Sequence, residues 1–163
     1  MLNFSIYHTW RLHDTVLIRP GVPELDFLNG SAAGNNGGRP RHEVEFQGGV
    51  TKNGLGARLS ANWQSGTTVN GSLNPGGGST DDLFFSDLLT FNLRLFADLG
   101  AQRSLVREHP FFRGSRVTLS INNLFNNRLD VRDSNGVTPL SYQPGYIDPL
   151  GRSIRISFRK MFF

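Results

Sequence analysis

The chain of 163 residues contains no cysteine, which excludes three classes of site at once. Without thiols there is no disulfide framework, no thiolate zinc site and no cysteine nucleophile. The sequence also lacks the G-x-S-x-G and H-E-x-x-H patterns of serine hydrolases and zinc proteases. We therefore expect no enzymatic activity, no cofactor and no metal ion.

Long hydrophobic runs are absent as well. No apolar run approaches the roughly 20 residues that a membrane-spanning helix requires. The start of the sequence, Met1-Leu2-Asn3-Phe4-Ser5, lacks the basic region and apolar core of a secretory signal. An exported protein with this sequence would need a signal upstream of residue 1.

Phenylalanine and glycine, by contrast, are plentiful, with 13 and 19 residues. Aromatic strands joined by tight turns use both, whereas a glycine inside a helix costs about 1 kcal/mol relative to alanine. A hydrophobic content of 37% is compatible with membrane strands, because only alternate residues of such strands meet lipid. The net charge of +4 is spread along the chain rather than clustered, so we expect no nucleic-acid partner.

Six segments alternate apolar and polar residues with the period of two that predicts β-strands. They cover residues 2–12, 41–51, 55–69, 85–99, 115–125 and 152–160. Their length of roughly ten residues or more exceeds the typical globular strand and matches the ~9–11 residues of a tilted membrane strand. The sequence therefore predicts one all-β domain, residues 1–163, that forms about six long strands of an antiparallel, up-and-down transmembrane β-barrel.

The connections between these segments differ in length. Asn53-Gly54 predicts a tight hairpin, the connections at 14–40, 70–82 and 126–150 are long, and the one at 100–114 is intermediate. Outer-membrane barrels have short periplasmic turns and long external loops. With a periplasmic C-terminus, the three long connections would be external, and residues 53–54 and 100–114 would be periplasmic.

Aromatic residues lie near the predicted strand ends, where membrane interfaces favour them. Phe111, Phe112, Phe162 and Phe163 lie at the predicted periplasmic ends, and Trp10, Phe84, Phe85 and Phe125 at the external ends. The alternative is that these rings cap a soluble core.

The last segment carries apolar residues on one face: Ile154, Ile156, Phe158 and Phe162. Chain termini are usually solvated, so terminal phenylalanines are unusual in a soluble protein, whereas a barrel strand presents them to lipid. We expect these four residues to form the terminal strand for barrel assembly. Phe163 lies one residue beyond this pattern, and Lys160 interrupts the apolar face where its amine can snorkel to the interface.

Two motifs resemble sequences of TonB-dependent outer-membrane receptors. Residues 117–128, which include Asn122-Asn123-Leu124-Phe125-Asn126-Asn127, resemble the family's penultimate strand and its Asn-Leu-Phe-Asn-type ending. Residues 142–152, which include Tyr142-Gln143-Pro144-Gly145, resemble the segment that leads into the family's last strand. The resemblance covers residues 116–163, and upstream of residue 116 only the alternating pattern agrees.

The resemblance implies a receptor barrel in the bacterial outer membrane for energy-coupled uptake of a scarce nutrient, such as a metal chelate, vitamin or glycan. The implied partners are outer-membrane lipid, the rest of the barrel, the plug domain, the TonB energy-coupling system acting through the N-terminal part, and the barrel-assembly machinery. The chain lacks the family's plug and coupling box and supplies six of about 22 strands. We therefore expect a C-terminal fragment, because single-chain barrels begin at about 8 strands.

The polar faces of the predicted strands carry charged residues: Arg58, Arg94, Arg116, Arg155 and Arg159, with Glu43, Glu45 and Asp98. The resemblance implies that such residues face the lumen, where they contact the plug or line the route of the substrate. Ion pairs with the plug and solvated lumen charges remain equal alternatives.

Other interpretations of the sequence are weaker. A soluble antiparallel β-sandwich that binds carbohydrate or protein is the main alternative to a barrel. Residues 76–80 are rich in glycine but lack the lysine of a phosphate loop, and Asp81 and Asp82 are typical of solvated loop charges. The four histidines, His8, His13, His42 and His109, are too scattered to predict a metal site.

Overall fold

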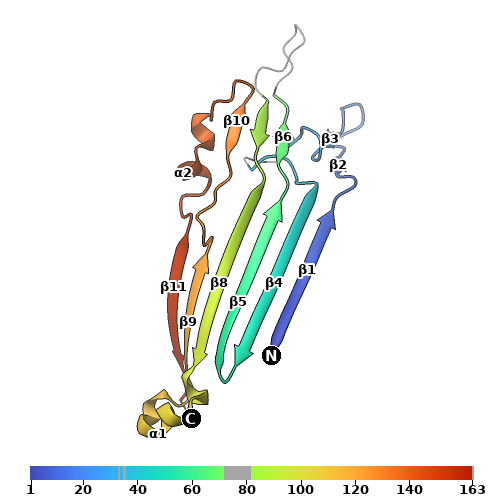
Figure 1. Cartoon of the computed structure of the whole chain (residues 1–163). Coiled ribbons are helices and arrows are strands. Elements are labelled where there is room, and N and C mark those ends of the chain that lie inside the picture. The colour runs from blue at the N-terminus through green and yellow to red at the C-terminus, as the bar shows by residue number, and fades with distance from the viewer. Residues whose placement is uncertain (33, 35, 72–81, 163) are drawn as a thin grey trace.

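The computed structural model describes residues 1–32, 34, 36–71 and 82–162, and its main element is one six-stranded antiparallel sheet (Figure 1). Its strands are β1 (Leu2–Trp10), β4 (His42–Lys52), β5 (Leu55–Gln64), β8 (Leu88–Asp98), β9 (Ser115–Asn122) and β11 (Ser153–Lys160). Each pairs with the next in this order. The predicted all-β, antiparallel, up-and-down class is therefore confirmed. Among the described residues the sheet is open, with β1 and β11 at its two edges.

The connections gather at the two ends of this sheet (Figure 1). The turn end carries residues 53–54 and the segment 99–114, which holds η1 (Leu99–Ala101), α1 (Arg103–Glu108) and η2 (Pro110–Phe112). The loop end carries the described residues of the segments 11–41 and 65–87, and the segment 123–152. Its elements are β2 (Thr15–Val16), β3 (Leu25–Asp26), β6 (Thr67–Val69), β7 (Leu83–Phe85), β10 (Val131–Asp133), η3 (Leu140–Tyr142) and α2 (Pro144–Ile147). The described residues of the three connections predicted to be long thus lie at the same end.

Two of the predicted strands are split, which the sequence pattern did not reveal. The predicted segment 55–69 divides into β5 and β6, and the segment 85–99 begins only at Leu88 in the main sheet. β6 and β7 instead form a small sheet with β10, in the order β10-β7-β6. Part of the connection 126–150 is therefore ordered structure rather than loop. Ser65 and Asp87 interrupt the alternation at the two breaks, since each takes a position that belongs to the apolar face. The sequence prediction extended both strands through these interruptions.

The predicted hairpin between β4 and β5 is confirmed. Asn53 and Gly54 have φ angles of 50° and 78°, and positive φ at both central residues is the mark of a type I′ turn. Glycine is needed at position 54 for a second reason, because a Cβ there would lie 2.5 Å from the Cβ of Ala101. The same residue thus shapes the hairpin and allows η1 to pack against it.

The register of the strands places most apolar residues on one face of the main sheet and most polar residues on the other. One row of directly opposed residues crosses all six strands on the apolar face: Leu2, Val50, Ala57, Leu95, Leu119 and Ile156. The adjacent row on the polar face is Asn3, Gly49, Arg58, Arg94, Ser120 and Arg155. The alternation predicted for single strands is therefore kept in phase across the whole sheet.

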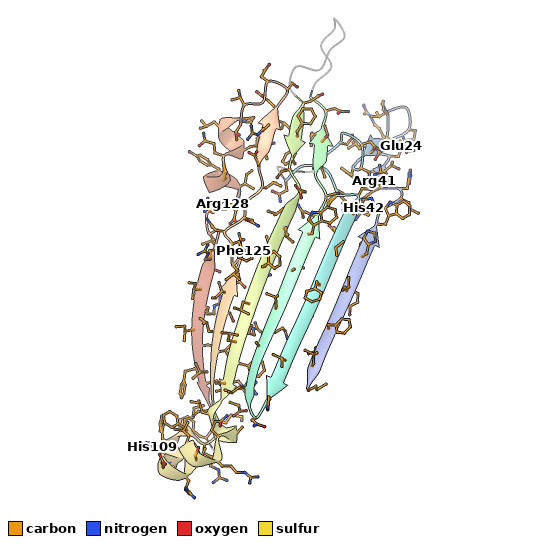
Figure 2. All side chains as sticks on the ribbon, viewed as in Figure 1. Glu24, Arg41, His42, His109, Phe125 and Arg128 are labelled. Carbon is orange, nitrogen blue, oxygen red and sulfur yellow. The ribbon has the colours of Figure 1, made fainter. Side chains whose placement is uncertain are left out.

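No described part of the chain covers the apolar face. Phe4 on β1 and Ile156 on β11 are each 74% exposed. Among the described residues, the buried apolar side chains are Phe85 and Val131, and both belong to the small sheet at the loop end. The long strands thus form a single layer (Figures 1 and 2).

The aromatic residues at the loop end have two different environments. Phe125 contacts Phe91 of the apolar face edge-on, with ring centres 5.2 Å apart. Phe85, which was predicted to lie at a membrane interface, is only 5% exposed and packs edge-on against Tyr142. The prediction for Phe85 was wrong, because the break between β7 and β8 takes this residue out of the main sheet.

The motif Asn122-Asn123-Leu124-Phe125-Asn126-Asn127 ends β9 with a set of local hydrogen bonds. Asn123 and Asn126 have φ angles of 50° and 59°, a left-handed conformation that asparagine tolerates. The buried side chain of Asn123 donates to the carbonyl of Asn127 (2.7 Å) and accepts from its amide (2.9 Å). The asparagines therefore have a structural role in redirecting the chain.

Replacing Asn123 with alanine should lower the free energy of unfolding by about 1–3 kcal/mol, because two partly buried backbone groups of Asn127 lose their partners. The matched control is Asn122→Ala, which removes an exposed hydrogen bond to the Ser153 hydroxyl and should cost less than about 1 kcal/mol. Denaturant unfolding followed by circular dichroism compares the two variants. Equal losses would contradict this role for Asn123.

Candidate functional site on the polar face

Three arginines form a row across the middle of the polar face. Arg58 lies directly opposite Arg94, and both Arg94 and Arg155 lie opposite Ser120. Arg58 and Arg94 lie on neighbouring strands, which are about 4.8 Å apart, and Arg155 lies two strands beyond Arg94. None of the three has an ion-pair partner within the part of the chain that the structure describes. Like charges directly opposite each other destabilise a sheet, so an anion bound at this row would stabilise it.

A groove of about 230 Å³ adjoins this arginine row. It is lined by Arg58, Ser60, Asn92, Leu93, Arg94, Ser120 and Asn122. Guanidinium groups bind carboxylates and phosphates with two parallel hydrogen bonds, and the hydroxyl and amide groups beside them can complete such contacts. The chemistry of the groove suits an anionic group.

The other two predicted arginines lie nearer the turn end. Arg116 and Arg159 are directly opposed on β9 and β11. Arg116 pairs with Asp98 (3.3 Å), and its guanidinium carbon lies 5.5 Å from the centre of the Phe96 ring. Register therefore places all five predicted arginines on the polar face. Among the described residues, Arg116 is the one of the five that has an ion-pair partner, Asp98.

Toward the loop end the polar face becomes acidic. Tyr7, Glu45, Asn62 and Thr90 form one row of opposed residues, and Thr9, Glu43 and Gln64 begin the next. These residues line a groove of about 240 Å³. The three predicted acids are thus separated along the sheet, with Glu43 and Glu45 at the loop end and Asp98 at the turn end.

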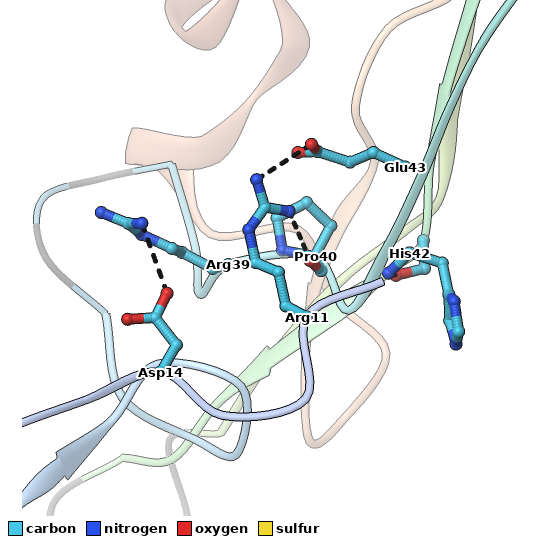
Figure 3. A network of polar contacts seen from close by, with 7 residues as sticks. Arg11, Asp14, Arg39, Pro40, His42 and Glu43 are labelled. Atoms are coloured by element: carbon cyan, nitrogen blue, oxygen red, sulfur yellow. Dashed lines mark hydrogen bonds and ion pairs between the residues drawn. The ribbon is translucent and has the colours of Figure 1, made fainter. Parts of the chain in front are cut away.

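A network of ion pairs and hydrogen bonds joins the chain at the loop ends of β1 and β4 (Figure 3). The Arg11 guanidinium donates to the Pro40 carbonyl and to the Glu43 carboxylate, each at 2.9 Å. Arg39 pairs with Asp14 at 3.3 Å. These contacts fix both ends of the connection 14–40. The odd-numbered alternation of Ser5 and Thr9 predicts the polar face for Arg11, but the sequence did not predict these contacts.

Two of the scattered histidines meet on the apolar face. His8 Nε2 lies 3.2 Å from His42 Nδ1, so one imidazole donates a hydrogen bond to the other. Trp10 stacks on His42, with ring centres 5.8 Å apart. His13 instead contacts Thr15, and His109 contacts Phe112 at the turn end. Nowhere in residues 1–32, 34, 36–71 and 82–162 do three metal-binding side chains of His, Cys, Asp or Glu come together.

A cavity of about 400 Å³ lies between the loop end of the sheet and the connections above it. Its lining includes apolar side chains (Phe85, Leu88, Leu129 and Ile147) and polar ones (Gln64, Thr90, Asn127, Arg128 and Asp148). The Nε of Arg128 is buried and has no hydrogen-bond partner among the described residues. A mixed lining of this kind is typical of small-molecule sites. Sequence analysis did not find the cavity, because its walls come from three distant connections.

The predicted terminal-strand residues lie at the edge of the apolar face. Ile154, Ile156 and Phe158 lie opposite Ile121, Leu119 and Val117, and Phe162 beyond the strand is 86% exposed. The Lys160 ammonium donates to the carbonyls of Phe111 and Arg113, and so fastens the strand to the segment 99–114. The amine thus reaches exposed carbonyls at the turn end, and whether it snorkels to a membrane interface stays a prediction.

Few contacts are described for the remaining residues singled out in the sequence. The glycine-rich residues 76–80, Asp81 and Phe163 lie outside the described residues. Asp82 accepts a hydrogen bond from the Gly71 amide (2.8 Å). Within the described part of the chain, the helices are too short or too polar to cross a membrane.

Comparisons with models of protein families, with curated proteins and with solved structures gave no match. A functional interpretation therefore depends on the residues and geometry of the chain itself.

Replacing Arg94 with glutamine should stabilise the isolated chain by about 0.2–1 kcal/mol, because it removes a like charge directly opposite Arg58. Arg116→Gln is the matched control with the same change of charge. It should be neutral or destabilising by up to about 1 kcal/mol, because it breaks an exposed ion pair with Asp98. Denaturant unfolding at low and high salt measures both effects. Destabilisation by Arg94→Gln would show that this row is already compensated.

Proposed function

We propose that this chain is the C-terminal part of the barrel domain of a TonB-dependent outer-membrane receptor, which takes up a scarce nutrient such as a metal chelate, vitamin or glycan. The observation that carries the proposal is an apolar face that extends over six strands and that no described residues cover, opposite a charged face. Soluble proteins rarely expose an apolar patch larger than a few hundred Å². Such a face is stable when it contacts the hydrocarbon of a lipid bilayer.

Strand length supports a membrane location. The longest strands, β4 and β8, have 11 residues each. At about 3.3 Å per residue they extend for roughly 36 Å, and a tilt of about 45° reduces this to about 25 Å along the membrane normal. This value is close to the height of the apolar band of outer-membrane barrels, which is about 25 Å.

The free edges of the sheet support a larger barrel. β1 and β11 each have only one neighbour among the described strands, and unpaired backbone groups are too costly in hydrocarbon. The six strands alternate in direction, so β1 and β11 run in opposite directions and further antiparallel strands can pair with both edges. We assign these edges to the remaining strands of the receptor barrel, and the terminal strand β11 to recognition by the barrel-assembly machinery.

On this proposal the polar face lines the lumen. The arginine row of Arg58, Arg94 and Arg155 then meets acidic groups of the plug domain, and coupling to the TonB system depends on the N-terminal part of the receptor. The acidic groove and the cavity at the loop end contribute to substrate capture. The protein supplies a pathway and binding groups rather than a catalytic step.

The alternative of a soluble β-sandwich requires a second sheet packed against the apolar face. The described residues supply no such layer, and the small sheet β10-β7-β6 lies at the loop end. The two functions differ in an easily measured property. A sandwich module is soluble and monomeric without detergent, whereas a barrel segment aggregates or requires detergent or lipid.

A charge introduced on the apolar face should prevent stable membrane insertion of the chain. We expect Leu119→Arg to cost about 2–4 kcal/mol, because arginine near the bilayer midplane has this penalty in outer-membrane barrels. Thr118→Arg is the matched control, since it places the same side chain on the polar face, and it should cost less than about 1 kcal/mol. The measurement is the protease-protected fraction in lipid vesicles. Equal insertion of both variants, or a wild-type chain that stays soluble without detergent, would contradict the proposal.

The end of the chain provides a second test. Deleting Phe163 should leave outer-membrane assembly of a complete receptor intact, whereas deleting Phe162 and Phe163 together should impair it. The reason is that Phe162 continues the apolar alternation of Ile154, Ile156 and Phe158, and Phe163 does not. The amount of receptor recovered in outer membranes measures assembly. Equal losses from the two deletions would mean that the terminal register is wrong.

A further inference from the structure

The turn end combines positive charge with exposed aromatic rings. Arg103 and Arg107 are four residues apart on α1 and therefore lie on the same side of the helix. Arg113 follows η2, and all three side chains are exposed. Glu108 is the only acid in residues 99–114, and no ion pair with these arginines is present among the described residues.

This positive charge lies where the apolar face ends. Lys160 follows Ile156 and Phe158 in the same alternation along β11. Its ammonium is held by the carbonyls of Phe111 and Arg113, and it lies 4.6 Å from the centre of the Phe111 ring. Phe111 is 61% exposed (Figure 2 shows the side chains of this segment around the labelled His109). The apolar strip of β11 thus leads to the turn end. The cationic and aromatic cluster there consists of Lys160, with Phe111 and Phe162 beside it, and the exposed arginines of this segment, Arg103, Arg107 and Arg113.

We propose that this cluster binds the headgroup of an anionic glycerophospholipid, with the acyl chains along Ile154, Ile156 and Phe158. This inference rests on the membrane location proposed above. Guanidinium groups bind phosphate oxygens with two hydrogen bonds, and aromatic side chains favour the headgroup level of a bilayer. Arg103, Arg107 and Arg113 supply the charge, and Phe111 and Phe162 supply the rings.

The dimensions of the strip match one leaflet. From Ile154 to Lys160 the strand advances six residues, or about 20 Å at roughly 3.3 Å per residue. With a tilt of about 45° this corresponds to about 14 Å of depth, close to half of the apolar band of about 25 Å in outer-membrane barrels. An occupant that fills both the strip and the cluster must be amphiphilic, so the site favours a lipid over a free anion or an acidic peptide.

The test uses the complete chain in uncharged detergent micelles, titrated with phosphatidylglycerol or with phosphatidylcholine, and bound lipid is counted by native mass spectrometry. The wild-type chain should prefer phosphatidylglycerol by about tenfold or more, because each basic residue near an anionic surface contributes to binding. The variant R103Q/R107Q/R113Q should lose most of this preference. The control variant R19Q/R132Q/R152Q has the same loss of charge in the loop-end segments and should keep it.

Three outcomes would overturn the lipid site: equal binding of both lipids by the wild-type chain, equal loss of preference in both triple variants, or displacement of phosphatidylglycerol by millimolar inorganic phosphate. These results leave the proposed function intact if the chain still inserts into lipid vesicles. A chain that binds neither lipid and remains soluble without detergent contradicts the membrane location instead. Failure of the lipid site and failure of the proposed function are therefore distinguishable.

Discussion

Most pairs in the ladders of the main sheet oppose apolar residues to apolar ones or polar residues to polar ones, from Leu2 opposite Val50 to Phe158 opposite Val117. Exceptions such as Phe96 opposite Thr118 are few. Side chains alternate between faces, so a slip of one residue in any ladder would place charges such as Arg155 on the apolar face. The main sheet gains little from a buried core, since the buried apolar residues of the described chain, Phe85 and Val131, lie in the small sheet. Backbone hydrogen bonds and cross-strand contacts therefore hold the long strands in register.

The same register distributes charge along the polar face. Acidic and amide groups lie toward the loop end, and Arg116 with Asp98 lies toward the turn end. In the middle lie three arginines that have no ion-pair partner in the described part of the chain. A molecule that moved along this face from the loop end would meet these chemistries in succession. Under the proposed function, the loop end is the place of capture and the arginine row is the contact for an acidic partner.

Local patterns explain which features were predictable from the sequence. The face of Arg58 or Arg94 follows from alternation within one strand, and Asn53-Gly54 specifies its own turn. The grouping of Arg58, Arg94 and Arg155 was not predictable, because it depends on the register between separate strands. The strand breaks, the burial of Phe85 and the loop-end cavity depend on long-range pairing of β6, β7 and β10. The Lys160 contacts likewise depend on how residues 99–114 fold back.

Three unsatisfied requirements of the described chain point to the same environment. The apolar face needs an apolar solvent, the edges of β1 and β11 need hydrogen-bonding strands, and the arginine row needs negative charge. A second sheet, as in a sandwich, would meet only the first requirement. A receptor barrel meets all three: lipid covers the apolar face, further barrel strands pair with the two edges, and an acidic segment in the lumen lies against the arginine row. The combination therefore favours the receptor barrel more strongly than the apolar face does by itself.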